Sequence, residues 1–380
     1  MIRIPFTEDF NIKEYEKQIS FISSAITGYK IENRTLLVNF DDSCEAGELE
    51  QMIRRSMQGF LGKEDTGNPE VLAENKRRQN YTSQERILNG TYIKSYGDGR
   101  IAFKDKAVWL FEYFDSVFRQ FALELGAQEE RYPVLLPVKA YADTGYLRNS
   151  PQYSMFCSDA VEDLEVLRQL RSVETLTVMD FLNPAHYVLS PSACFSVYES
   201  YRGQTLPENC TITLCQNVFR NEGRFNWKDF GRLRDYHVRE IVFIGSREYV
   251  TASRERIMDK TIEYMKQTGL AGTVESSADH FIIPQMQKFK MIQMQKKLKY
   301  EWKLSVSQTE EMAVASFNLH EFNFTRSFGI SVNGTETVTG CVGFGLERMV
   351  LAFLSQFGLE ASRWPEEVRK SERNRKNDGR

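Results

Sequence analysis

The strongest constraint on the fold is a run of charged residues between two apolar, strand-like segments. The apolar segments are residues 211–219 and 241–244, and RNEGRFNWKDFGRLRDYHVRE joins them. Successive side chains of an extended strand point to opposite faces, so the pattern predicts a hairpin with charge along one face. That face carries Arg220 and Glu222 on the first arm, and Arg232, Arg234, Tyr236, Val238 and Glu240 on the second.

A charged hairpin face of this kind fits two roles. Guanidinium forks bind phosphates and an aromatic ring stacks on a base, so the face could hold a nucleoside triphosphate. It could equally be a solvated sheet surface with cross-strand ion pairs. The chain has no GxGxxG or GxxxxGK[ST] segment, so any nucleotide would be bound from strands instead of a phosphate loop.

A glycine-rich segment near the C-terminus, TGCVGFGLERMVLAFL at residues 339–354, is the second informative pattern. Gly340, Gly343 and Gly345 permit close approach of the backbone. Arg348 follows among the apolar residues of a predicted helix, where an unpaired guanidinium is costly to bury. Its partner is therefore either a bound anion or a carboxylate of the protein.

The remaining periodicity predicts a mostly antiparallel sheet flanked by helices. Residues 107–125 present a broad apolar helical face that ends at Gly126, a C-terminal cap, and runs into the proline-marked segment YPVLLPV. Strand-like runs occupy residues 186–190, 211–219, 232–244, 313–318 and 328–332, and helical patterns occupy 161–170, 247–268 and 284–299. These elements indicate an α+β protein.

Shifts in composition divide the chain into four parts. Residues 1–61 form a small α+β appendage with one amphipathic helix. Residues 62–99 are polar and punctuated by Gly, Asn and Pro, as in a linker or lid. Residues 100–360 form the main domain, with a helical insert at 247–303, and the polar tail 361–380 is expected to be disordered.

Charge and cysteine content exclude several classes of protein. The net charge is −3, with 49 basic and 52 acidic residues, so no global field attracts nucleic acid or a membrane. No apolar run reaches the length of a membrane span and the start lacks a secretory leader, so a cytoplasmic protein is expected. The six cysteines form no CxxC pair, which favours free thiols or isolated metal ligands over disulfides.

Three elements together resemble, in chain order, motifs 1, 2 and 3 of the class II aminoacyl-tRNA synthetases. They are the helix with its proline segment, the FRNE hairpin that returns through RLRDY, and GFGLER, all within residues 102–357. TGYLRNSPQY, SPSACFSVYESYRG, LKYEWKL and ASFNLHEFNF narrow the resemblance to the amino acid:[carrier protein] ligases, relatives of the zinc-dependent seryl-tRNA synthetases of methanogens. The resemblance implies the class II catalytic fold.

This resemblance implies a catalytic zinc ion held by Cys194, Glu240 and Cys341. Three protein ligands leave one coordination position open, as is typical of catalytic zinc. That position would take the α-amino group of the amino acid, which orients the substrate and rejects molecules without an amine. Without the resemblance, the two cysteines would be read as ordinary buried residues.

The resemblance also implies how ATP is bound. Arg220 would contact the α-phosphate, Glu222 the adenine amino group and Arg348 the γ-phosphate. Tyr236 would stack on adenine, and Arg232 belongs to the same nucleotide-binding face. The reaction is attack of a carboxylate on the α-phosphorus with release of pyrophosphate, which needs charge neutralisation and in-line positioning more than a protein acid or base.

Four further residues are candidates for contacts with an ion or the substrate. Magnesium is expected on the triphosphate, and Glu310 and Glu311 are candidate ligands. Asn318 and His320 are candidates for the amino-acid pocket, although His320 could instead be a satisfied core histidine. The family usually activates small neutral amino acids, so a substrate of this kind is expected by analogy.

The acceptor of the activated amino acid separates two hypotheses. In the carrier-protein ligases it is the phosphopantetheine thiol of a small acidic carrier, and in a synthetase it is a ribose hydroxyl of tRNA. The methanogen-type synthetases bind tRNA with a large N-terminal domain, and the shorter region before residue 100 lacks a basic, aromatic-interleaved footprint. A carrier protein is therefore the expected partner, and tRNA is not.

Two further expectations concern partners. A predicted helix rich in methionine could dock the acidic carrier, or form a solvated basic face, through Lys288, Lys290, Lys296, Lys297, Lys299 and Lys303. The helix at 107–125 would form a homodimer interface, as motif 1 does in this superfamily. A non-catalytic paralogue serving as a binding or regulatory subunit is a third hypothesis, disfavoured because every implied ATP and zinc residue is present.

Overall fold

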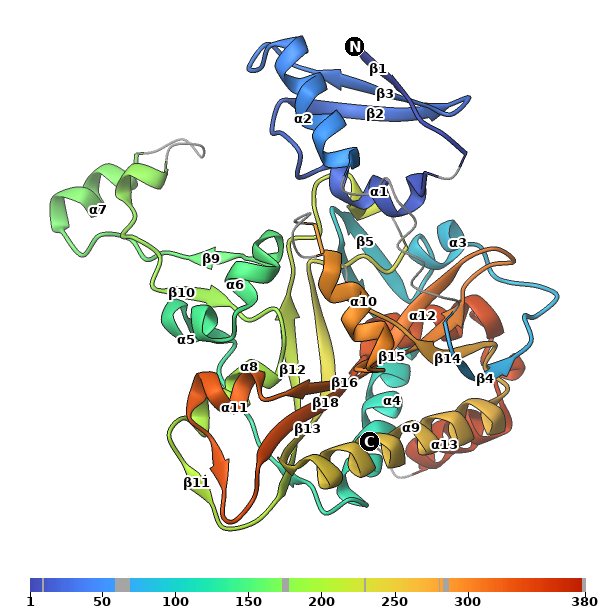
Figure 1. Cartoon of the computed structure of the whole chain (residues 1–380). Helices are drawn as coiled ribbons and strands as arrows, with labels where there is room; N and C mark the ends of the chain where they lie inside the picture. Colours follow the sequence, from blue (N-terminus) through green and yellow to red (C-terminus); the bar gives the residue numbers. More distant parts are fainter. Residues whose placement is uncertain are drawn as a thin grey trace.

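The computed structural model (Figure 1) describes residues 1–8, 10–58, 69–172, 178–228, 230–279, 281–282 and 287–377. Its centre is an eight-stranded sheet of order β4-β14-β15-β16-β18-β13-β12-β7. Neighbouring strands are antiparallel except β12 and β7, as the sequence predicts. The strands are β4 (Val71–Asn75), β7 (Gln128–Glu129), β12 (Cys210–Phe219), β13 (Asp235–Ser246), β14 (Gly272–Ser276), β15 (Lys299–Ser305), β16 (Glu311–Glu321) and β18 (Thr337–Gly345).

Three helices cover one face of this sheet, and they are α4 (Lys106–Leu123), α9 (Arg247–Thr268) and α12 (Leu346–Phe357). Phe118 of α4 is fully buried and stacks on Phe344 of β18, with ring centroids 4.0 Å apart. The helices predicted at 107–125 and 247–268 are thereby confirmed. Within the described ranges, no helix combines the length and the hydropathy needed to cross a membrane.

Shorter elements pack on the opposite face. The helices are α8 (Cys194–Ser200), α11 (Asn323–Phe328), α5 (Val138–Asp143), α6 (Tyr146–Asn149) and the turn η1 (Pro151–Tyr153). The strands form a small sheet of order β8-β10-β9 and the pair β11-β17, with bounds β8 (Leu135–Pro137), β9 (Phe156–Cys157), β10 (Tyr187–Leu189), β11 (Thr205–Leu206) and β17 (Ser331–Val332). The strand predicted at 328–332 is therefore shortened to β17.

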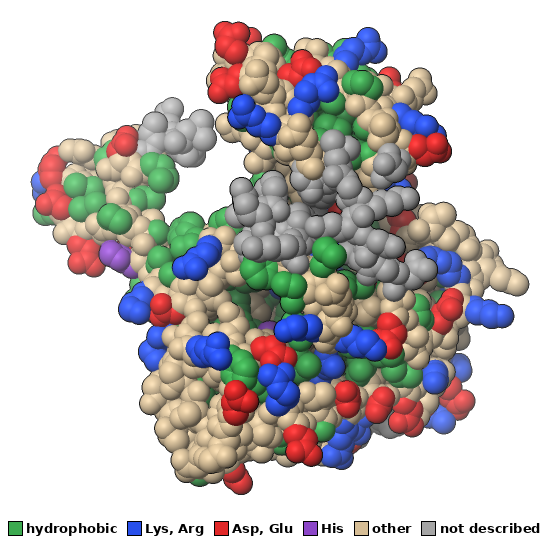
Figure 2. All heavy atoms as spheres, in the orientation of Figure 1, with side chains coloured by type: hydrophobic (Ala, Val, Ile, Leu, Met, Phe, Trp, Pro, Cys, Tyr) green, Lys and Arg blue, Asp and Glu red, His purple; other side chains and the backbone are tan. Residues whose placement is uncertain are grey.

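An arm that contains α7 (Leu164–Leu170) and η2 (Val178–Phe181) projects from the body (Figure 1). No residue of α7 is buried. Large apolar side chains are exposed on the arm, among them Phe156, Leu164 and Met179, and Figure 2 shows such side chains gathered there. The arm therefore contributes little to the core.

Residues 1–58 form a separate α+β unit at the top of Figure 1. A sheet of order β1-β3-β2 packs against two helices. Their bounds are β1 (Ile2–Pro5), α1 (Ile12–Ile19), β2 (Ile26–Glu32), β3 (Thr35–Phe40) and α2 (Ala46–Gln58). Leu49, Ile53 and Met57 of α2 are buried at helical spacing, which gives the unit a core of its own.

Residues 69–99 contain regular structure where a polar linker or lid was expected. β4 forms an edge of the large sheet, and α3 (Gln84–Leu88) and the hairpin of β5 (Ile93–Gly97) with β6 (Arg100–Phe103) follow it. The Asn75 side chain donates to the carbonyl oxygens of Met265 and Leu270. Backbone pairing and this amide hold β4, so an edge strand forms here although its apolar residues Val71 and Leu72 are exposed.

The insert at 247–303 is not wholly helical. It contributes β14 and β15 to the sheet, and α10 (Gln287–Gln295) ends before β15 begins. On β15 the buried Trp302 alternates with charged neighbours, so Lys299 and Lys303 lie on a strand and not on the predicted helix. Residues 284–286 of that predicted helix lie outside the described part of the chain.

The C-terminal tail is helical where disorder was expected. The turn η5 (Ala361–Arg363) leads into α13 (Glu366–Asn377). Trp364 and Val368 are buried in the core beneath α4, at 2% and 0% exposure. Two apolar side chains therefore anchor a tail whose composition is otherwise polar.

Phe118→Ala is expected to lower the free energy of unfolding by about 3–5 kcal/mol, because it opens a cavity between α4 and β18. Urea unfolding followed by circular dichroism measures the change. Glu255→Ala, on the exposed side of α9, is the control and should change the free energy by less than about 0.5 kcal/mol. Equal stability of the two variants would contradict this packing.

Candidate active site

The candidate site lies on the sheet face opposite α4, where strand register aligns its residues. β13, β18, β16 and β15 are successive neighbours in the sheet. Residues paired directly across strands share a face and lie side by side. The pairing gives two adjacent rows, Glu240–Gly343–Ser316 and Val242–Cys341–Asn318–Lys299.

The three predicted zinc ligands are brought together on this face. Cys194 is the first residue of α8, which packs above the rows. One ligand atom each of Cys194, Glu240 and Cys341 lies within 4.8 Å of the other two, and all three residues are buried. Gly343 provides space, since a Cβ there would lie 2.8 Å from a carboxylate oxygen of Glu240. The arrangement offers three ligand atoms to one ion.

Cys194, Glu240 and Cys341 form an acidic cluster, and burial makes its ionised form unfavourable without a cation. Burial raises the pKa of the Glu240 carboxyl to about 7. The hydrogen bond with Cys194, burial and the charge of Glu240 together raise the pKa of the Cys341 thiol well above its usual value. A divalent cation would take the place of these protons, and two sulfurs with one carboxylate suit zinc better than magnesium. The residues present therefore fit a zinc ion.

Polar side chains of β16 and α8 line the space beside the cluster. Asn318 donates to the Ser316 hydroxyl at 3.1 Å, and its Nδ2 lies 3.6 Å from the Cys341 sulfur. His320 Nε2 also lies 3.6 Å from that sulfur, and its Nδ1 lies 3.2 Å from the Tyr198 hydroxyl. Burial lowers the pKa of His320 to about 4, so the ring is neutral at pH 7. Both predicted pocket residues thus adjoin the cluster.

The charged residues predicted on the hairpin arms lie mainly in the loop between them. Pairing of β12 with β13 ends at Phe219 and Asp235. Gly223 and Gly231, with φ of 92° and 78°, turn the chain within the loop. The prediction of one shared strand face is therefore wrong for Arg220, Glu222, Arg232 and Arg234, and holds for Tyr236, Val238 and Glu240.

The loop nevertheless gathers the five predicted ATP-binding residues. Glu222 is 5% exposed and accepts a hydrogen bond from Arg232 at 2.8 Å, and Arg348 Nη2 lies 4.0 Å from its other oxygen. The guanidinium carbons of Arg348 and Arg220 lie 5.2 and 5.8 Å from the ring centroid of Tyr236. Three guanidinium groups gathered beside an aromatic ring are a set of donors that suits a polyphosphate.

Three other charged residues have protein partners. Glu311 forms an ion pair with Arg77 at 2.7 Å, and Glu310 accepts a hydrogen bond from Gln84 at 2.8 Å. Arg234 donates to the backbone of the turn between β5 and β6. The assignment of Glu310 and Glu311 to magnesium stays a prediction.

An ion pair that the sequence reasoning missed borders the site. Lys299 continues the row of Cys341 and Asn318, and it contacts Asp279 at 2.8 Å and Glu301 at 3.1 Å. Although burial raises it, the charge of Lys299 lowers the pKa of Asp279 to about 2. The alternation of charge in KYEWK was the available signal, because it places Lys299 and Glu301 on one strand face.

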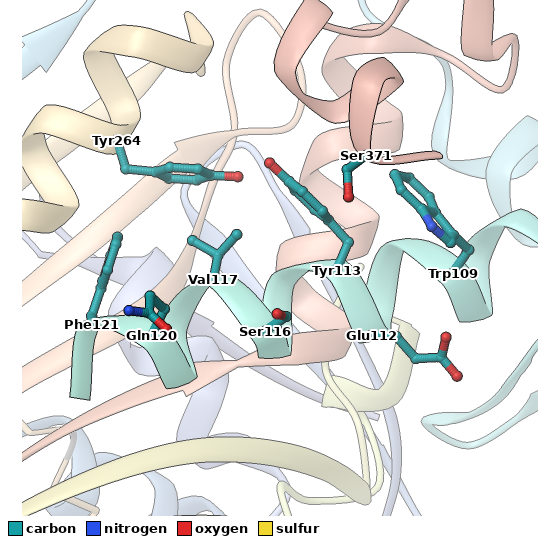
Figure 3. A pocket seen from close by; sticks show the side chains of 9 residues that line it. All are labelled: Trp109, Glu112, Tyr113, Ser116, Val117, Gln120, Phe121, Tyr264 and Ser371. Atoms are coloured by element: carbon teal, nitrogen blue, oxygen red, sulfur yellow. The ribbon is translucent and has the colours of Figure 1, made fainter. Parts of the chain in front are cut away.

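A cavity of about 530 Å³ lies elsewhere, beside α4 and α9 (Figure 3). Tyr113 of α4 and Tyr264 of α9 point toward each other across it, with Ser371 of α13 nearby. Its lining contains neither the arginine cluster nor the three buried metal-ligand candidates. This cavity is therefore separate from the candidate site on the strand face.

Comparison with known proteins defines the class. Residues 179–357 match the tRNA synthetase class II core domain (G, H, P, S and T). A crystal structure of M. kandleri SerRS in complex with A. aeolicus tRNASec has a TM-score of 0.67 and 19% identity, covering 99% of this chain and 77% of that chain. The fold is therefore the class II synthetase core, an α+β fold with its sheet flanked by helices.

Sequence relatives narrow this class. The chain is 30% identical over 255 residues to an amino acid–[acyl-carrier-protein] ligase of Bradyrhizobium diazoefficiens, covering 65% of this chain and 76% of that protein. It is 24% identical over 296 residues to a type-2 serine–tRNA ligase of Methanococcus aeolicus, covering 73% of this chain and 56% of that protein. The chain belongs to the family of amino acid–[acyl-carrier-protein] ligases, which confirms the resemblance of its motifs.

Glu222→Gln is expected to destabilise the fold at neutral pH, because it leaves three arginines without their shared carboxylate. Although burial opposes ionisation, Arg232, Arg348 and Arg220 lower the pKa of Glu222. Such a carboxylate stabilises the fold above its unfolded pKa of about 4.3, and the contribution is lost as pH falls through the folded pKa. Urea unfolding should show a loss of about 1–3 kcal/mol at pH 7 and a smaller loss near pH 3.

The exposed Glu255→Gln substitution on α9 is the matched control for this pH series. It should show no difference from the unaltered protein at either pH. A deficit in the Glu222 variant that is the same at both pH values would contradict an ionised Glu222 in the folded state.

Proposed function

We propose that this protein activates an amino acid with ATP and transfers the aminoacyl group to the phosphopantetheine thiol of a carrier protein. The observation that carries the proposal is that one face of β13 carries both Tyr236, which the arginine cluster adjoins, and the predicted zinc ligand Glu240. The guanidinium carbons of Arg220 and Arg348 lie 5.8 and 5.2 Å from the ring centroid of Tyr236, and Glu240 lies four residues further along the same strand. The carrier-protein ligase among the relatives supports the same reaction.

Activation makes one bond and breaks another at the α-phosphorus. A carboxylate oxygen of the amino acid attacks, and the bond to the bridging oxygen of pyrophosphate breaks, which leaves an aminoacyl-adenylate. We assign Arg220 and Arg348 as catalytic residues, because their charges on the α- and γ-phosphates would neutralise the transition state. Tyr236 would stack on adenine and Glu222 would accept from its amino group. Magnesium would accompany the triphosphate.

Transfer uses the same intermediate. The thiolate of the phosphopantetheine arm attacks the carbonyl carbon of the adenylate, a C–S bond forms, and AMP leaves as the C–O bond breaks. Neither step requires a protein side chain to be consumed or oxidised. The protein's task is to hold the reacting groups in line.

Cys194, Glu240 and Cys341 are assigned as the zinc ligands. Their ligand atoms lie within 4.8 Å of one another and are buried. Zinc bound there would offer an open coordination position to the α-amino group. Asn318 and His320 would then adjoin the bound amino acid, since both approach the Cys341 sulfur at 3.6 Å. A small, neutral amino acid is the expected substrate by analogy with the family.

A carrier protein is favoured over tRNA as the acceptor. The N-terminal unit, residues 1–58, holds seven Lys and Arg against ten Asp and Glu. Figure 2 shows both signs mixed over its visible face. Such a surface is a poor match for a phosphate backbone. The serine–tRNA ligases among the relatives make tRNA the competing acceptor in a test.

Two contacts with partners were predicted, one through a lysine-rich helix and one through α4. The predicted lysine-rich helix is shorter than expected, since Lys299 and Lys303 lie on β15, and Lys290 and Lys297 are paired with acidic residues. Docking of an acidic carrier through the remaining lysines stays a proposal. Lys296 is exposed, and the side chain of Lys288 lies outside the described residues. A homodimer through α4 stays a proposal.

Exchange of pyrophosphate into ATP, measured with a panel of amino acids, tests the activation step. We expect exchange with a small neutral amino acid, and Arg220→Ala or Arg348→Ala should lower it at least about 100-fold. Arg363→Ala, in an exposed ion pair with Glu360, is the control. Mass gain on a phosphopantetheinylated carrier protein supports the transfer step, and charging of total tRNA alone would overturn it.

Cys194→Ser and Cys341→Ser are expected to remove both the bound zinc and the exchange activity, because each takes away one buried sulfur ligand. Inductively coupled plasma mass spectrometry of the purified protein gives the zinc content. Cys44→Ser, in the N-terminal unit and outside the cluster, should retain both. Full activity in a zinc-free protein would end the metal assignment.

A further inference from the structure

The N-terminal unit packs directly on the loop that joins β12 to β13. Gly223 in this loop adopts φ of 92°, and a Cβ there would lie 2.8 Å from the ring of Phe21 and from the Cβ of Ser20. The ring of Phe225 meets that of Tyr29 edge to face, with centroids 5.6 Å apart. The contact therefore involves the loop backbone as well as its side chains.

The side chain of Arg224 binds the main chain of the N-terminal unit. Its guanidinium donates to the carbonyl oxygens of Ser20 at 2.9 Å, Ser23 at 2.7 Å and Ile26 at 2.7 Å. Ser20 is the C-cap of α1, where carbonyl oxygens lack intrahelical partners and carry the negative end of the helix dipole. A guanidinium satisfies these oxygens with a forked set of donors that a lysine does not offer.

Asn226 links the unit to a nucleotide-binding residue. Its side-chain amide donates to the carbonyl oxygen of Lys17 in α1 at 3.1 Å and to that of Glu222 at 2.7 Å. The backbone N–H of Phe225 donates to the Ser20 hydroxyl at 3.0 Å. The carboxylate of Glu222 in turn accepts from Arg232. A continuous set of hydrogen bonds thus runs from α1 to the arginine cluster.

The geometry points to the N-terminal unit as a clamp on the nucleotide-binding loop, with Arg224 and Asn226 as positioning residues; this inference rests on the proposed function. The loop lies beyond the last paired residues of β12 and β13, so the sheet alone does not fix its conformation. A loop that is already ordered does not lose conformational entropy when ATP binds. The clamp therefore raises the affinity for ATP and leaves the amino-acid site unaffected.

The amino-acid site is independent of these contacts. Its proposed residues lie on β13, β16, β18 and α8, and none of the hydrogen bonds of Arg224 or Asn226 reaches them. Loss of the clamp should consequently weaken ATP binding selectively. A general loss of folding would weaken both substrates together.

Titration calorimetry of the full chain with a non-hydrolysable ATP analogue tests the clamp in Arg224→Ala and Asn226→Asp. Asn226→Asp keeps the size of the side chain. It replaces the amide group that donates to two carbonyl oxygens with a carboxylate oxygen, which can only accept. We expect each to weaken binding about tenfold. The KM for ATP in pyrophosphate exchange should rise in parallel, with the KM for the amino acid and the melting temperature near those of the unaltered protein.

Arg54→Ala is the matched control, since Arg54 pairs with Glu50 on the exposed side of α2 within the same unit. ATP binding by Arg224→Ala and Asn226→Asp equal to that of Arg54→Ala would overturn the clamp, as would equal losses for ATP and the amino acid. The calorimetry needs no turnover, so it judges the clamp separately from the reaction. Absence of exchange in the unaltered protein would overturn the proposed function instead.

Discussion

The register of β13 against β18 is the constraint on which the candidate site depends. It sets Glu240 opposite Gly343 and, by alternation, sends Arg239 to the other face of the sheet. A slip of one residue would turn Glu240 toward α4 and Arg239 toward the site. Gly343 helps to fix this arrangement, because any side chain there would occupy the space of the Glu240 carboxylate. Strand pairing, more than any one polar contact, therefore positions the acidic cluster.

Buried charge on the two faces of β13 is handled in different ways. On the helix face, Arg239 is 3% exposed and contacts Asp115 at 2.7 Å and Glu129 at 3.1 Å, so the protein itself supplies its counter-charges. On the site face, Glu240 lies beside two cysteines, and its pKa is raised to about 7 by burial. A buried ionised group is tolerated only with a partner. Arg239 has its partners in the fold, whereas the proposed zinc ion would supply the counter-charge for Glu240 and the two cysteine thiolates.

The sequence predicted the elements whose signal is local. α9 begins after the Ser246 cap and ends at Gly269, and both residues are visible in the sequence. Cys194, Glu240 and Cys341 came from the resemblance, since nothing in their spacing distinguishes a ligand from a core residue. β4 was missed because its partner, β14, lies far away in the chain, and the short segment VLAEN does not alternate apolar and polar residues. The charged loop was read as strand because its charges happen to recur at a period of two.

The N-terminal unit, residues 1–58, contacts the loop that carries most of the arginine cluster. The arginine cluster and the acidic cluster can therefore be altered separately. The arginine cluster is formed by the loop after β12 together with Arg348 of α12. The N-terminal unit contacts that loop from outside the sheet. The acidic cluster of Cys194, Glu240 and Cys341 is formed by paired strands and α8. On the proposed function, substitutions in the N-terminal unit would change the affinity for ATP without disturbing strand register, whereas changes near Gly343 would act directly on the carboxylate of Glu240.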